Sequence, residues 1–326
     1  LAKKWWEIWQ KNKTHQEFSE LTEKILRLIL KNEPIDTPDI KTRMALAELQ
    51  FQKGEFEQAS ENYNLASLKS IDLLSQNKEL KSEISQDTDL NQKNLATLAH
   101  DSTYSALFAK EKSIEKEKTD SKTEQRKEII TRYLKNFPKG DYFSEVNLKL
   151  AIIYYEENKL NDSTLVLERL ITEKTNLEVK TKAEDLLLDI KNIEKKYSEV
   201  KNLAIKFNQS STDMARKKTL NKIYEESHYF ESKEQIKTMD PRSSAFELYE
   251  YYQSHPQSDL GKQAFLDALN LLIKNKFLVD GTLKTIEFIK AFPGFEKRLL
   301  LKKDLITSLI EIGELSKAAD YLLEIS

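Results

Sequence analysis

The 326-residue chain contains no cysteine, and this absence excludes several kinds of site. Without thiols there can be no disulfide scaffold, no thiolate nucleophile and no thiolate metal ligand. Glycine and proline are scarce, at 6 each, which is too few for a protein built from repeated β-hairpins. The longest apolar run, residues 25–30, carries Arg27 and is far shorter than the roughly 18 residues of a membrane span. Composition therefore favours long helices.

A dominant charge and a catalytic motif are also missing. The 52 basic and 54 acidic residues give a net charge of −2, so no global field would attract nucleic acid. The six glycines are isolated, and no phosphate-binding glycine loop or nucleophile elbow occurs. The four histidines lie far apart, and His255 takes the place that phenylalanine fills in two related segments, which predicts packing. We expect no enzyme, no cofactor and no metal site.

What the chain does have is helical periodicity. Leu148, Ile152 and Tyr155 follow the i, i+3, i+4 spacing of one helix face. The six prolines all fall between periodic segments, where helices must end. The pattern predicts an all-α fold of roughly 14 to 16 helices with short connections.

One set of offsets recurs three times along the chain. In each copy an apolar helix leads to a tight turn at Gly or Asn, and a second helix follows that carries a small residue five positions after the turn. The three turn and small-residue pairs are Gly54 and Ala59, Asn158 and Ser163, and Gly313 and Ala318. A small residue lets two helices cross closely. Because one helix pair cannot bury its own apolar face, consecutive pairs must stack.

These repeats resemble the tetratricopeptide repeat (TPR) family. The similarity lies in the turns GEFEQA and GELSKA at 54–59 and 313–318. It lies also in three repeat-closing segments, YLKNFP at 133–138, YYQSHP at 251–256 and FIKAFP at 288–293. The resemblance implies an α-solenoid of stacked antiparallel helix pairs, wound as a right-handed superhelix.

Two polar stretches interrupt the repeats, at residues 75–94 and 110–128. The second holds 7 basic and 6 acidic side chains, a mixture typical of an exposed helix or a solvated loop. The stretches divide the chain into an N-terminal helical module, 1–120, with one clear unit at about 40–70, and TPR-like repeats over 121–326. In the alternative, the polar segment between these two parts is an insertion between repeats.

The repeat pattern is weaker in two later regions. Residues 175–240 are expected to be degenerate repeats. Over 260–291 we expect Gly281 to occupy the turn position, which places Ile286 where the small residue usually stands.

In the TPR family the first helix of each pair lines the concave, ligand-binding surface. The register of the resemblance implies a set of partner-binding residues here: Glu48, Phe51, Lys149, Ile152, Tyr155, Lys303 and Ile310. Their mixture of apolar side chains and both charges does not reproduce the lysine- and asparagine-rich clamp of chaperone-binding members. The resemblance therefore implies a protein or peptide partner held by aromatic and aliphatic anchors, with charges setting the register.

All three tryptophans, Trp5, Trp6 and Trp9, lie beside Lys3 and Lys4 at the start of the sequence. One interpretation is a helix that caps the open end of the solenoid core. A second is a belt at a lipid–water interface, which would place a lost membrane helix or anchor just before Leu1. A third is an aromatic patch that binds a partner.

These observations predict a non-enzymatic scaffold that binds a protein or peptide partner. The repeat-closing segments also look like those of periplasmic TPR proteins, which implies a bacterial cell-envelope assembly and a periplasmic or envelope-associated location, with the cytoplasm as the alternative. The alternative function is a structural spacer that self-associates through its ends and convex face. We expect no nucleic-acid partner, and membrane contact only through an anchor before Leu1.

Overall fold

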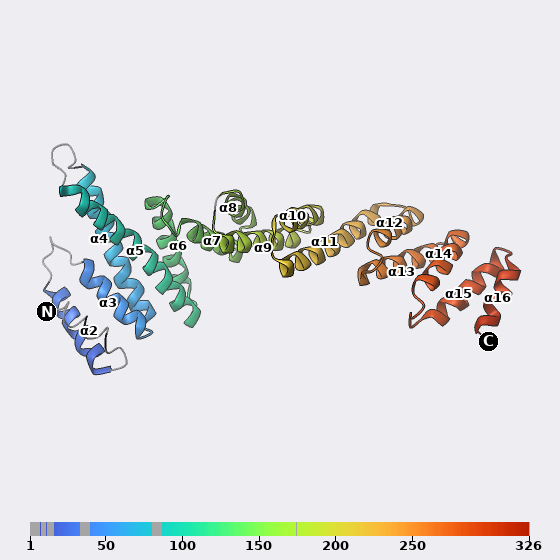
Figure 1. Cartoon of the computed structure of the whole chain (residues 1–326), viewed down its shortest axis with the longest axis horizontal. Helices are drawn as coiled ribbons and strands as arrows, with labels where there is room; N and C mark the ends of the chain where they lie inside the picture. Colours follow the sequence, from blue (N-terminus) through green and yellow to red (C-terminus); the bar gives the residue numbers. More distant parts are fainter. Residues whose placement is uncertain are drawn as a thin grey trace. The chain divides into compact units, whose positions relative to one another are not determined.

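The computed structural model describes residues 7, 11, 16–32, 40–79, 87–173 and 175–325. Within these residues the fold consists of fifteen α-helices and one short 3-10 helix, with no strand (Figure 1). The predicted all-α solenoid of stacked helix pairs is confirmed. No helix among the described residues is long and apolar enough to cross a membrane.

The chain divides into two compact units, which meet at Leu186 inside helix α9 (Leu177–Ile193). The helices of the first unit before α9 are α2 (Gln16–Lys31), α3 (Ile40–Gln52), α4 (Phe56–Glu79), α5 (Asp87–Lys116), α6 (Asp120–Asn136), α7 (Phe143–Glu156) and α8 (Leu160–Thr172). Those of the second unit after α9 are α10 (Tyr197–Ser210), α11 (Met214–Gln235), η1 (Ile236–Thr238), α12 (Pro241–Ser254), α13 (Asp259–Lys274), α14 (Leu278–Ala291), α15 (Arg298–Glu311) and α16 (Leu315–Ile325). The division at residue 120 stays a prediction.

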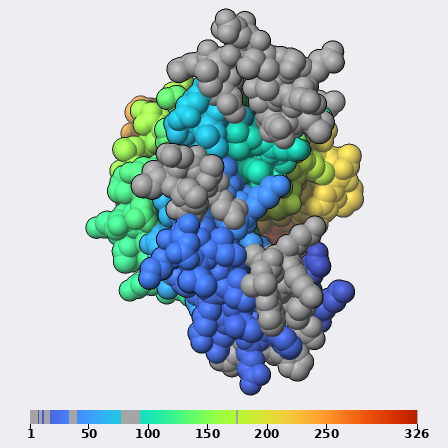
Figure 2. All heavy atoms as spheres, turned by 90° about the vertical axis from the view of Figure 1, so that its left-hand side faces the viewer, coloured from blue at the N-terminus to red at the C-terminus, as the bar shows by residue number. Residues whose placement is uncertain are grey.

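Within each unit, helices that follow one another along the chain pack against each other. In the first unit these contacts run from α2 to α8, and in the second from α10 to α16. Figure 2 shows α2 and α3, in blue, beside α4 and α5, in cyan and teal. From α3 onwards, odd-numbered helices are the first helices of the pairs and even-numbered helices the second.

Five pairs are joined by the same turn, in which one residue takes a positive φ. These residues are Gly54, Asn158, Lys195, Lys276 and Gly313, with φ between 57° and 81°. In each turn the next residue donates a backbone hydrogen bond to the carbonyl five positions earlier, as Glu55 does to Gln50 at 2.9 Å. This pattern ends a helix and satisfies carbonyls that would otherwise lack donors.

The turn at Lys276 shows that the prediction for residues 260–291 was wrong in register. Gly281 is not the turn residue but the small residue, five positions after the turn. A Cβ there would lie 3.5 Å from the Ile273 side chain, so α14 passes close to α13 at this point. Ile286 therefore does not stand at the small-residue position of this pair, as was expected. Lys195, in the region predicted to be degenerate, forms the same turn between α9 and α10.

Each unit has its own apolar core. In the first, small residues such as Ala47, Ala59 and Ala106 pack with large ones such as Ile130 and Tyr133. In the second, the core runs through α11 to α16 and contains several aromatic rings: Tyr249, Tyr251, Phe265 and Phe288. A single helix pair cannot bury its own apolar face. Burial of these rings between stacked pairs therefore supplies much of the stabilisation.

The stretch 110–128 was expected to be solvated, and this prediction was wrong at three positions. Lys110, Ser113 and Arg126 are all buried. They lie on the sides of α5 and α6 that face other helices. Lys110 and Ser113 bond to Glu57, and one terminal nitrogen of Arg126 bonds to Glu156.

Candidate protein-interaction surface

The predicted binding residues of the first unit all lie on first helices. Glu48 and Phe51 belong to α3, and Lys149, Ile152 and Tyr155 to α7. Helix α5 lies between these two in chain order and is also a first helix. The surface formed by these three helices is called here the first-helix face.

Phe51 is a packing residue as well as a surface residue. Its ring centroid lies 5.0 Å from that of Phe56 and 5.5 Å from that of Phe108 on α5, and it packs partly buried against the core. Phe108 is 41% exposed and was not among the predicted residues. The helical period of α5 could have located it, but the charged residues that follow it in the sequence obscured that period.

Two polar contacts join α5 to α7 and fix the spacing of the first-helix face. The Lys149 ammonium lies 2.6 Å from the Glu111 carboxylate, and the Tyr104 hydroxyl donates to Glu145 at 2.7 Å. Burial, together with the hydrogen bond to Glu145, raises the pKa of Tyr104, so this hydroxyl stays a donor at neutral pH. Lys149, predicted to contact a partner, already has a carboxylate partner within the chain.

Glu48 is also engaged within the chain. It accepts hydrogen bonds from the Tyr63 hydroxyl at 2.8 Å and from the Gln52 amide at 2.5 Å. Burial and the Glu48 carboxylate both raise the pKa of Tyr63, so this bond too persists at neutral pH. By contrast, Ile152 is 37% exposed and Tyr155 is partly exposed, so both can contact a partner.

In the second unit, Lys303 and Ile310 lie on α15 and both are exposed. Ile310 is 50% exposed, and Leu300 on the same helix is 56% exposed. Trp5, Trp6 and Trp9 lie outside the described residues. No contact of these predicted residues with a partner has been tested, so their role stays a prediction.

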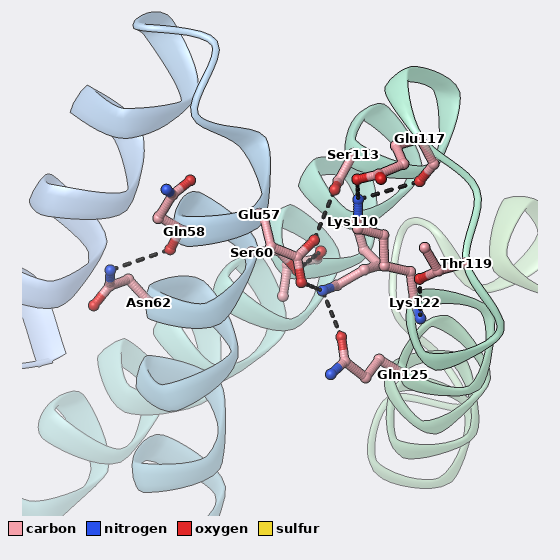
Figure 3. Close-up of polar contacts among 11 residues, drawn as sticks. Glu57, Gln58, Ser60, Asn62, Lys110, Ser113, Glu117, Thr119, Lys122 and Gln125 are labelled. Atoms are coloured by element: carbon pink, nitrogen blue, oxygen red, sulfur yellow. Dashed lines mark hydrogen bonds and ion pairs between the residues drawn. The ribbon is translucent and has the colours of Figure 1, made fainter.

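A polar cluster around the buried Lys110 and Ser113 holds α4, α5 and α6 together (Figure 3). The Lys110 ammonium lies 2.5 Å from a Glu57 oxygen and 2.6 Å from the Gln125 side-chain oxygen, while Ser113 donates to the other Glu57 oxygen at 2.7 Å. Burial acts to raise the pKa of Glu57, but the bonds from Lys110 and Ser113 prevail and lower it. This arrangement positions helices, since all the groups involved are satisfied by one another.

Aromatic clusters lie where two of the repeat-closing segments end. In the first unit, Tyr133 bonds to His100 Nε2 at 2.7 Å and accepts from the Tyr142 backbone N–H at 3.2 Å. In the second, His255 stacks on Tyr251 with ring centroids 4.6 Å apart, which agrees with its predicted packing role. Among the residues that the structure describes, no three His, Asp or Glu side chains are grouped so as to hold a metal ion.

Comparison with known proteins adds little to this picture. No protein-family model matches the chain, and no curated protein matches it. One similar solved structure is a circular tandem repeat protein with novel repeat topology and enhanced subunit contact surfaces, with a TM-score of 0.30, 12% identity, and coverage of 99% of this chain and 88% of that chain.

A second similar structure is that of Naa15/Naa10 bound to HypK-THB, with a TM-score of 0.26 and 15% identity. The match covers 99% of this chain but only 60% of that one, so this chain spans less than two thirds of its length. At these TM-scores, the helical-repeat architecture rests on this chain's own turns, helix contacts and cores.

Proposed function

We propose that the chain is a non-enzymatic scaffold of TPR type that holds a protein or peptide partner on its first-helix face, within a bacterial envelope assembly. The observation that carries the proposal is the row of accessible apolar side chains formed by Phe108 on α5 and by Ile152 and Tyr155 on α7. Aromatic and aliphatic anchors of this kind supply most of the binding energy in protein interfaces.

The polar contacts around this row support the same proposal. Lys149–Glu111 and Tyr104–Glu145 hold α5 and α7 in register before any partner arrives. A surface ordered in advance loses less conformational entropy on binding, which favours affinity. The charges also disfavour partners with the wrong charge pattern.

The test is site-specific photo-crosslinking in the source cells. A benzoylphenylalanine at Ile152 is expected to crosslink a partner protein. The same residue at Leu165, a 66% exposed position on the second helix α8, is the matched control and is expected to yield no such product. Phe108→Ala with Tyr155→Ala should lower the yield from position 152 by about tenfold or more. Identical products from both positions would contradict the proposal.

The alternative function is a spacer that self-associates through its ends and its convex face, which the second helices form in a TPR-like solenoid. Leu165 on α8 and Leu283 on α14 favour it, because both are more than 60% exposed and each lies two positions after the small residue of its pair. The same experiment separates the two functions: crosslinks between copies from position 165, with none from 152, would support the spacer.

A further inference from the structure

The second helices α4 and α6 of the first unit border a groove. Its main hollow has a volume of about 700 Å³ and is lined by Ile71 and Ser75 of α4 and by Thr131, Arg132, Lys135 and Asn136 of α6, among others. A smaller hollow of about 160 Å³ adjoins it and shares Glu128. This groove, called here the α4–α6 groove, lies on second helices and is separate from the first-helix face.

Two cations of this groove have no carboxylate partner. Among the described residues, neither Arg132 nor Lys135 forms an ion pair. The Arg132 guanidinium donates to the neutral side-chain oxygen of Asn64, and its buried Nε–H has no acceptor. Burial lowers the pKa of Arg132 and outweighs the charge of Glu128, four positions earlier on α6, which acts to raise it. Lys127, which also lines the groove, pairs with Glu124 and Glu157.

The equivalent pair of second helices in the second unit is arranged differently. Between α12 and α14, Arg242 bonds to Asp280 at 2.8 Å and Tyr249 donates to Glu287. Lys284 also reaches Glu287, at 3.0 Å. Each of these two cations is therefore neutralised within the chain. In the α4–α6 groove, by contrast, neither Arg132 nor Lys135 contacts a carboxylate of the described part of the chain directly, and the charge of Glu128 acts on Arg132 without an ion pair.

We propose that the α4–α6 groove binds an acidic peptide segment of a partner protein, whose carboxylates pair with Arg132 and Lys135. A carboxylate matches the planar guanidinium, and pairing with a partly buried arginine is stronger than pairing with an exposed one. The aliphatic side chain of Ile71 in the groove suits a peptide that also carries apolar residues.

The groove suits a peptide better than a nucleic acid. It spans only a few helical turns and offers two cations that form no direct ion pair with the described residues, whereas nucleic-acid sites are long basic stripes. Glu128 also lines it and would repel a continuous phosphate backbone. A peptide can place its carboxylates beside the cations and leave the space near Glu128 to neutral side chains.

The proposal can be tested with the full chain and a fluorescein-labelled octaglutamate peptide, followed by fluorescence anisotropy at low salt. We expect saturable binding that weakens as salt is added. Lys135→Gln should weaken it about fivefold, and Arg132→Gln more, since Arg132 is the more buried cation. Glu128→Gln should tighten it, because a repulsive charge is removed. Lys206→Gln, on the exposed side of α10, is the matched control and should have no effect.

Lys135 is exposed, so its variant keeps the test valid even if Arg132→Gln disturbs the fold. Absent binding, or binding that Lys135→Gln and Glu128→Gln leave unchanged, would overturn the proposal. Equal displacement of the peptide by inorganic phosphate or by a short single-stranded DNA would also overturn it, in favour of a general anion site. Failure of the crosslink at Ile152 would concern the first-helix face alone, so the two proposals fail independently.

Discussion

Gly261 is the glycine at which an added methyl group would meet the most severe obstacle. It is the third residue of α13, and a Cβ there would lie 2.0 Å from the backbone oxygen of His255. That oxygen accepts a hydrogen bond from the Ser258 N–H at 3.2 Å, so it cannot simply turn away. We predict that Gly261→Ala displaces the first turn of α13 from the segment that closes the preceding repeat.

The expected loss of stability follows from two contributions. Relief of the clash requires a backbone shift, and overpacking of this kind costs about 1–3 kcal/mol. The shift also strains the helix cap, in which the Gly261 N–H donates to the Ser258 hydroxyl at 2.9 Å, and loss of a cap costs about 1 kcal/mol. Alanine's better helix propensity returns up to about 1 kcal/mol. The net loss in free energy of unfolding should be about 2–3 kcal/mol.

Urea unfolding followed by far-UV circular dichroism measures this loss, and hydrogen exchange locates it. Exchange should accelerate in α12 and α13 and stay unchanged in α5 and α6. Gly294→Ala is the control, because no heavy atom lies within 4 Å of a Cβ there and its φ is not positive. If both variants unfolded at the same urea concentration, the argument from the His255 carbonyl would be refuted.

Three further predictions concern titration, a buried ion pair and a turn. Burial, followed by the charges of Lys201 and His255, lowers the pKa of His228. The unfolded chain therefore binds this proton more readily than the folded chain, so the free energy of unfolding should fall as the pH drops below about 6.5. The urea midpoints at pH 7.5 and pH 5 should differ less in His228→Phe than in the wild type. Lys110→Met should cost about 1–2 kcal/mol by leaving the partly exposed Glu57 without its cation. Adding Glu57→Gln should restore part of this loss in a double-mutant cycle; additive losses would count against a coupled pair. Lys276→Gly should raise the unfolding free energy by about 0.5–1 kcal/mol, because glycine adopts positive φ without strain; a lower urea midpoint than wild type would contradict this.

The helix pairs were predictable because their signals are local. Gly54, Asn158 and Gly313 were expected at tight turns, and all three have positive φ. Lys195 and Lys276 occupy the same turns but carry no such signal, since lysine does not favour this conformation. Backbone hydrogen bonds set by the packing of the helices hold them there.

The environment of individual side chains was less predictable, because it depends on contacts across long stretches of sequence. Lys110 looked solvated among neighbouring charges, yet it is buried against Glu57, 53 residues earlier. Phe51 was expected to line a groove, but it also packs on Phe108 from the next pair. Helical period indicates which face of a helix is apolar, and not which distant residue will cover it.

The two aromatic clusters and their apolar counterpart show how the tyrosine hydroxyls of the interior are satisfied. A ring on a first helix packs against a buried ring on a second helix in three places, His100 on Tyr133, His228 on Tyr251 and Phe265 on Phe288. Each tyrosine hydroxyl has a partner, which is His100 in the first case and the Glu225 carbonyl in the second. The phenylalanine pair needs none.

The repeats therefore share the packing of one ring on another, while the residue type at each position differs. Where the residue is a tyrosine, its hydroxyl has a hydrogen-bond partner. Arg132 is a partly buried cation that no carboxylate among the described residues contacts directly, although α12 and α14 show that a neighbouring second helix can supply such a contact, as Asp280 does for Arg242. Phe108 and Ile152 likewise remain accessible beside ion pairs that hold their helices in place. If partners bind at these two places, as proposed, Arg132 gains a direct carboxylate contact and the accessible apolar side chains of the first-helix face become buried.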